Sequence, residues 1–152
     1  MIGARAARGA AGSRDADGAS GNGSPGGFGG ASNGKLTISG GNLYVGSGGD
    51  GLDVNGSATM TGGTVIVNGP TSSGNGTLDY DGTFELSGGL LIAAGSAGMA
   101  QGPSADSSQS SIVMTYPETQ AAGTLVRLED AAGNAIAAFA PAKDYSMMII
   151  SS

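Results

Sequence analysis

The chain has 152 residues, 31 of them glycine, a formal net charge of −6, and no cysteine, histidine or tryptophan. These absences exclude disulfides, thiolate or imidazole metal ligands and imidazole-based catalysis, so any metal ion must be held by oxygen atoms. The acidic balance argues against nucleic acid as a partner and is compatible with binding of cations, while the many glycines favour frequent turns over helices.

Residues 1–33 form the first segment and are rich in glycine, serine and alanine. This composition is typical of an arm or linker, because it buries too little apolar surface to offset the entropy lost on ordering. Its aromatic residue Phe28 is either incidental or a contact that docks on a partner. The opening MIGARAARGAAG lacks the apolar stretch of a secretory signal, and no run in the chain approaches the length of a membrane span, so we expect no span. We expect the sequence to be a piece of a longer chain.

A repeat begins at Gly34 and becomes visible when the double glycines are aligned. Its copies are GKLTISGGNLYV (34–45), GSATMTGGTVIV (56–67) and GTFELSGGLLIA (82–93), spaced by 22 and then 26 residues. Each copy holds two strand-like runs around a Gly-Gly corner, which is typical of a solenoid. Alternation of side chains predicts four inward columns, Leu36/Ala58/Phe84, Ile38/Met60/Leu86, Leu43/Val65/Leu91 and Val45/Val67/Ala93.

The stretch GGDGLDVNG (48–56) supplies a third side, because it aligns with GNGTLDYDG (74–82). The aligned pairs are Leu52 with Leu78, Asp53 with Asp79 and Val54 with Tyr80, and we expect Met99 to continue the leucine column. The first six residues of GGDGLDVNG also fit a nonapeptide calcium repeat, but the ninefold period of such repeats is missing. We therefore predict an all-β fold in which residues 34–105 form a right-handed parallel β-helix, a solenoid of about three coils.

Residues 106–152 follow a different pattern and are predicted to form a C-terminal β cap. TLVRLEDAAGNAIAAFAP has alternating runs around a Gly-Asn turn, which predicts an antiparallel hairpin, and YSMMIISS predicts a further strand. We expect this region to cover the last coil, because an open end would expose core side chains and unpaired backbone groups.

Two long blocks carry a resemblance to a known family. They are GDGLDVNGSATMTGGTVIVNGPTSSGNGTLDYDGTFELSGGLLIAAGSAGMAQ and TQAAGTLVRLEDAAGNAIAAFAPAKDYSMMIISS. Together they resemble the C-terminal part of a family of bacterial carbohydrate-binding-domain proteins, which are secreted parallel β-helices, and the likeness extends over residues 34–152. The resemblance implies an extracellular or cell-surface protein that binds calcium and acidic polysaccharide of the polygalacturonate type.

Acidic residues of the third side form a candidate metal site. We expect Asp53 and Asp79 to stack on the outer surface of neighbouring coils, with Asn55 and Asp81 in register beside them. Such like charges repel each other, and calcium, which takes roughly six to eight oxygen ligands, would neutralise them. Asp50, at the corner before Asp53, is a further candidate ligand. The alternative for Asn55 and Asp81 is that each only forms a turn before a glycine.

The insertion that lengthens the second repeat is NGPTSSGNGT (68–77), beside the acidic residues. It is either a tolerated loop or the wall of a binding site, in which case Asn68, Ser72 and Asn75 are candidate ligand-binding residues. Tyr44 is a candidate contact for a polysaccharide that binds a flat surface instead.

Outward apolar residues predict a stripe on the face after the Gly-Gly corner, made of Tyr44, Ile66 and Ile92, joined by Leu90. Exposed stripes of this kind in soluble proteins are usually covered. Either a C-terminal strand of the same chain covers it, or a second molecule does, by adding a strand to the edge of the first coil. We expect self-association, with Phe28 as a further candidate contact.

The sequence favours a non-catalytic, calcium-dependent binding module for acidic polysaccharide. Catalysis of the pectate-lyase type is disfavoured because Lys35 is the only basic residue in the coils and projects from a different side than Asp53 and Asp79. The acidic residues also form a flat ladder rather than the facing pair of a glycoside hydrolase. The alternative hypothesis is a structural subunit of an extracellular filament or surface assembly, built by stacking coils.

Overall fold

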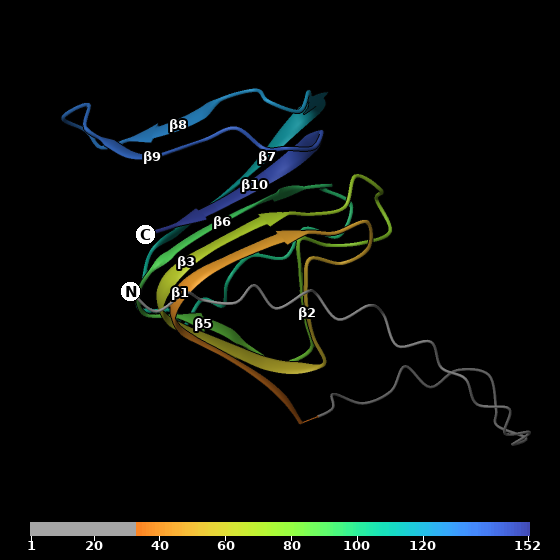
Figure 1. The fold of residues 1–152 in the computed structure, drawn as a ribbon, viewed down its shortest axis with the longest axis vertical. Coiled ribbons are helices and arrows are strands. Elements are labelled where there is room, and N and C mark those ends of the chain that lie inside the picture. Colours follow the sequence, from red (N-terminus) through yellow and green to blue (C-terminus); the bar gives the residue numbers. More distant parts are fainter. Residues whose placement is uncertain (1–32) are drawn as a thin grey trace, which may run out of the picture.

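A computed structural model describes residues 33–152, which form ten strands and no helix (Figure 1). The strands are β1 (Gly34–Gly46), β2 (Leu52–Val54), β3 (Gly56–Asn68), β4 (Leu78–Tyr80), β5 (Phe84–Leu86), β6 (Leu90–Gly95), β7 (Ser111–Gln120), β8 (Val126–Glu129), β9 (Ala135–Phe139) and β10 (Tyr145–Ser151). The expected all-β class is confirmed. Phe28 and the arm up to residue 32 lie outside the described residues.

Six strands form one mixed sheet in the order β1-β3-β6-β10-β7, with β5 also paired with β3. β1, β3, β5 and β6 run parallel, whereas β10 is antiparallel to both of its neighbours. β2 and β4 form a separate parallel pair, and β8 and β9 form an antiparallel hairpin. β1 and β3 curve sharply midway along their length (Figure 1), so the first half of each strand faces a different direction from the second.

The repeats aligned from the sequence lie side by side in the predicted register. Leu43 pairs with Val65, and Val65 in turn pairs with Leu91, so one predicted inward column crosses three strands. The corners of the second and third repeats contain Gly63 and Gly89, with φ of 93° and 95°. Glycine is favoured there because a Cβ atom makes this left-handed conformation costly.

The core lies beneath the repeats and is densest in the second and third of them. Leu86 and Leu91 are both 0% exposed, as predicted. The first repeat is different, because its inward residues are only half-buried; these are Leu36, Ile38, Leu43, Val45 and Leu52. Full burial was the wrong expectation for them, since β1, and β2 in the case of Leu52, are edge strands whose outer sides no strand within residues 33–152 covers. Met99 does not continue the leucine column either and is 47% exposed.

The C-terminal region contains the predicted hairpin and the predicted last strand. β8 and β9 pair around a turn in which Asp130 Oδ1 accepts hydrogen bonds from the backbone N–H groups of Ala132 and Asn134, at 2.8 and 2.9 Å. β7 is an additional strand that the prediction lacked. Its run SIVMTY is rich in β-branched and aromatic residues, which is the signal that indicates it.

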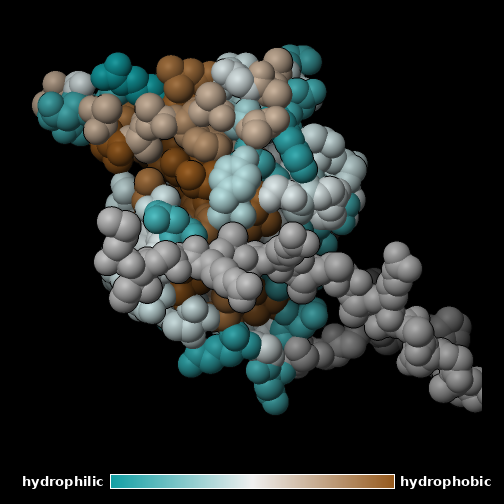
Figure 2. Space-filling model, viewed as in Figure 1, coloured by the Kyte–Doolittle hydropathy of each residue, from teal (hydrophilic) through white to brown (hydrophobic). Residues whose placement is uncertain are grey.

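The hairpin covers the outer face of the mixed sheet rather than the end of the repeats. Ile92, Met148 and Ile150 form the buried floor of a second apolar cluster, against which hairpin residues pack. Figure 2 shows the hydrophobic side chains gathered along and beneath this hairpin. The expectation that residues 106–152 cover the last repeat therefore agrees with β10, which pairs edge to edge with β6, whereas the hairpin β8–β9 covers the sheet face instead.

The far end of the repeats is closed by side chains of residues 101–109. The Gln101 carboxamide accepts from Tyr80 N–H and donates to Tyr80 C=O, both at 3.2 Å. Ser104 Oγ and Ser107 Oγ accept from the N–H groups of Phe84 and Leu86, at 2.7 and 3.1 Å. Polar side chains thus pair the backbone of β4 and β5 where no further strand follows.

Candidate functional site

Asp53 and Asp79 are neighbours on the parallel pair β2–β4. Their Cα atoms are register partners, and Leu52 pairs with Leu78 in the same ladder. Because successive side chains of a strand point to opposite faces, burial of Leu78 at 1% exposure turns both aspartates outward. Asp53 is exposed and Asp79 is half-buried. The predicted acidic pair is therefore present at the surface.

Asp79 is the electrostatic centre of this surface. Partial burial raises the pKa of the Asp79 carboxyl, and the negative charges of Asp50, Asp53 and Asp81 raise it further. A cation bound nearby would lower the pKa of Asp79 again, because a positive charge favours the ionised carboxylate.

The remaining candidate ligands are less well placed to hold a metal. Asp50 Oδ1 accepts a hydrogen bond of 2.8 Å from Gly76 N–H, so one of its oxygens fixes the insertion to the preceding corner. Asn55 and Asp81 lie in the bends after β2 and β4, which agrees with the turn-forming alternative. Within residues 33–152 no three acidic side chains come close enough to form a metal-binding group by themselves.

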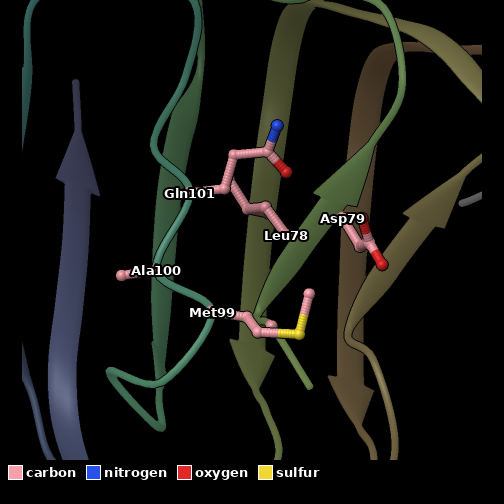
Figure 3. A pocket seen from close by; sticks show the side chains of 6 residues that line it. Leu78, Asp79, Met99, Ala100 and Gln101 are labelled. Atoms are coloured by element: carbon pink, nitrogen blue, oxygen red, sulfur yellow. The ribbon is translucent and has the colours of Figure 1, made fainter. Parts of the chain in front are cut away.

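A pocket of about 310 Å³ lies directly beside Asp79 (Figure 3). It is lined by Gly76, Leu78, Asp79, Met99, Ala100 and Gln101. Met99 and Leu78 supply an apolar surface, Asp79 supplies a carboxylate at the rim, and Gln101 is fixed by its bonds to Tyr80. The sequence did not predict this pocket, because it lies between β4 and the segment 99–101, whose position depends on tertiary packing.

The insertion that follows β3 divides into a buried end and an exposed tip. Asn68 is 1% exposed, and its carboxamide donates to Tyr44 Oη at 2.9 Å and accepts from Ala142 N–H at 2.7 Å. The predicted ligand-binding role of Asn68 is therefore corrected to a structural one, since its side chain is already bonded at both ends. At the tip, Asn75 Nδ2 donates to Ser72 Oγ at 3.0 Å, with Ser72 exposed and Asn75 half-buried.

The residues of the predicted apolar stripe are paired across the sheet as expected, but only part of the stripe is exposed. It is one row across the sheet, in which Tyr44 pairs with Ile66, Ile66 with Ile92, Ile92 with Ile150, and Ile150 with Ile112. Tyr44 is 62% exposed, whereas Ile92 is 3% exposed beneath the hairpin. Ile92 and the half-buried Leu90 are therefore corrected as assembly contacts, because the chain's own C-terminal strands cover them.

No family model matches this chain, and comparisons with curated proteins and with solved structures find no match either. The described part of the chain, residues 33–152, includes no helix of the length and apolarity needed to cross a membrane.

Proposed function

We propose that this protein is a non-catalytic, extracellular or cell-surface module that binds acidic polysaccharide through calcium, on a right-handed parallel β-helix. The observation that carries the proposal is the register of Asp53 with Asp79 on neighbouring strands. Support for the β-helix comes from the parallel pairing of three repeats at the spacing read from the sequence. The resemblance to the carbohydrate-binding-domain family supports the ligand class.

Calcium would be shared between protein and polymer. Asp53 and Asp79 offer two outward carboxylates, which is fewer ligands than calcium takes in a closed protein site. Carboxylates and hydroxyls of a polyuronate supply oxygens of the same hard character. An incomplete protein site is therefore suited to an ion that joins two acidic partners, and this accounts for binding of an acidic polymer by a chain of net charge −6.

The surroundings of the pair support binding rather than catalysis. A uronate lyase needs a basic group beside the calcium to remove a proton next to the carboxyl. Arg127 is instead engaged with Glu129 at 2.7 Å in the hairpin. Lys143 Nζ donates to the backbone carbonyl of Ser47, which follows β1, and so lies outside the β2–β4 pair that carries the aspartates.

Binding of polygalacturonate with and without calcium tests the proposal. We expect calcium to promote binding at micromolar polymer and a chelator to abolish it, while neutral glucans bind poorly. The double variant Asp53→Asn/Asp79→Asn should lose the calcium response. Asp106→Asn/Glu118→Gln is the matched control, because it removes the same charge from exposed positions elsewhere and should retain the response. Equal calcium responses in both double variants would contradict the proposal.

A structural subunit of an extracellular filament or surface assembly remains the second candidate, favoured by the edge of β1. No described strand covers this edge, and the inward residues of the first repeat are half-buried there. A lysine on an edge strand discourages pairing with another chain. Thr37→Lys on β1 should therefore reduce any self-association measured by sedimentation velocity, whereas Thr61→Lys on the inner strand β3 should not. A chain that is monomeric at high concentration would remove this candidate.

A further inference from the structure

Tyr44 is an exposed aromatic ring held in a fixed position. The ring is 62% exposed, yet its hydroxyl accepts a hydrogen bond of 2.9 Å from Asn68 Nδ2, and Asn68 is itself 1% exposed. The ring lies close to Gly46, where an added Cβ would come within 3.9 Å of Tyr44 Cε1. An aromatic side chain that is tethered at its tip and open on one side loses little entropy when a ligand packs against it.

Lys143 lies in the same region of the structure as Tyr44 and Asn68, although it is 99 positions after Tyr44 in the sequence. Asn68 Oδ1 accepts from Ala142 N–H at 2.7 Å, which brings the β9–β10 turn against the end of β3. The next residue, Lys143, donates through Nζ to the carbonyl of Ser47, which directly follows β1. Asn68 therefore joins the aromatic ring to the segment that carries the amine.

The Lys143 amine has no acidic partner in the described structure. The ion pair Arg127–Glu129 is the only one within residues 33–152. Lys143 is half-buried, and its amine donates to a neutral carbonyl oxygen, that of Ser47. An ammonium group offers three donors, so an anion can still bind there. The hydroxyl of Tyr44 accepts from Asn68 and retains its own proton for donation to a ligand.

We propose that Tyr44 and Lys143 form a second, calcium-independent saccharide site that takes a sugar ring bearing a carboxylate. The apolar C–H face of the ring packs on the exposed face of Tyr44, and the carboxylate pairs with Lys143. A flat ring and a single anionic group match an aromatic surface beside one amine. The site deepens the proposed function and rests on it for the polymer to which the sugar belongs, but it lies on the β1–β3 face rather than at Asp53 and Asp79.

Nuclear magnetic resonance titration with digalacturonate in the presence of a chelator tests this site. We expect saturable shifts of the Gly46 backbone amide and the Asn68 carboxamide signals. The neutral disaccharide galactobiose should bind more weakly because it lacks the carboxylate, and inorganic phosphate should not reproduce the shifts because it lacks a ring. Equal shifts with digalacturonate and galactobiose, or with phosphate, would overturn the proposal.

Variants assign the two contacts separately. Tyr44→Leu and Lys143→Met should each weaken binding by about tenfold or more, while Lys143→Arg, which keeps the charge, should restore it. Tyr44→Phe keeps the ring but loses the hydrogen bond from Asn68 Nδ2, so it should bind more weakly than the parent and more tightly than Tyr44→Leu. Unchanged affinity in Lys143→Met, or in Tyr44→Leu that folds, would contradict the proposal.

The double variant Asp53→Asn/Asp79→Asn separates this site from the calcium site. It should lose calcium-dependent polymer binding but keep the shifts at Gly46 and Asn68. Loss of those shifts in the double variant would show that no independent site exists at Tyr44. Shifts that persist when wild-type protein shows no calcium-dependent binding would instead refute the proposed function and leave the Tyr44 site standing.

Discussion

At the scale of single residues, Asp79 and Asn68 differ in the charges and hydrogen bonds that surround them. Asp79 is half-buried among three other aspartates, and its pKa is raised by burial and by their charges. Asn68 has the opposite character, because its buried carboxamide is bonded at both ends and joins segments 74 positions apart. A polar residue in a repeat insertion is therefore not a ligand contact by virtue of its position alone.

The raised pKa of Asp79 predicts how stability depends on pH. An acid whose pKa is higher in the folded than in the unfolded state stabilises the fold at low pH, and this contribution is lost as pH rises from the usual value of 3.8 through the folded pKa. Asp79→Asn should therefore be more stable than the parent at neutral pH without calcium, with the advantage disappearing in acid. Thermal unfolding followed by circular dichroism at several pH values measures this.

Asp130 provides the control of opposite sign. Hydrogen bonds from Asn134 and from the backbone of the turn lower the pKa of its carboxyl. Its contribution to stability is therefore present above the usual pKa and is lost as pH falls through the lowered folded value. Asp130→Asn should be less stable than the parent at neutral pH. Identical pH profiles for the two variants would contradict the assignment of both carboxyl groups.

Truncation of Asn68 should reveal its structural role. Asn68→Ala leaves Ala142 N–H and the Tyr44 hydroxyl without their partner, and a lost buried hydrogen-bond partner costs about 1–3 kcal/mol. Asn75→Ala, at the exposed tip of the same insertion, should change the free energy of unfolding by less than about 0.5 kcal/mol. Urea denaturation of both variants measures this difference. Equal losses of unfolding free energy would contradict the structural role of Asn68.

At the scale of elements, the sequence predicts the repeats well because apolar and polar residues alternate within each repeat. Alternation fixes which side chains point inward, and a shift by one residue would turn the whole apolar set outward, so the register of β1 with β3 follows from the pattern. The hairpin β8–β9 follows from its turn residues in the same way. What covers the outer row at Ile92 does not follow, because β10 and the hairpin are remote in sequence from β6 and their placement is decided by tertiary packing.

The Gly-Gly corners should respond to alanine according to conformation and space. At Gly89, φ is 95° and an added Cβ would lie 2.6 Å from the carbonyl oxygen of Gly63, so Gly89→Ala combines strain with a backbone clash. Gly40→Ala has open space and no positive φ, and Gly123→Ala, in the turn before β8 and outside the repeats, has open space with φ of 82°. We expect Gly40→Ala to be nearly neutral, Gly123→Ala to cost about 1 kcal/mol, and Gly89→Ala to cost more than either. Melting temperatures in any other order would contradict the corner geometry.

At the scale of the whole molecule, the two ends of the repeats differ. Beyond β4 and β5, side chains of residues 101–109 pair the backbone, and β10 pairs with β6. At β1 the inward residues are half-buried and no described strand follows. The sequence pattern predicts a covered last repeat and an open first one, but it does not predict the contribution of Gln101, Ser104 and Ser107, which look like ordinary loop residues until their partners are known. The mixed sheet has a further edge at β7 within residues 33–152, so association through unpaired backbone is expected at β1 or at β7.

Calcium shared between the Asp53–Asp79 pair and a uronate is the central claim, and anomalous X-ray diffraction from crystals grown with calcium and oligogalacturonate tests it most directly. The account predicts an anomalous peak between the two carboxylates, with sugar oxygens completing its coordination. Bound oligogalacturonate with no peak at Asp53 and Asp79, or calcium held only at other residues, would contradict it.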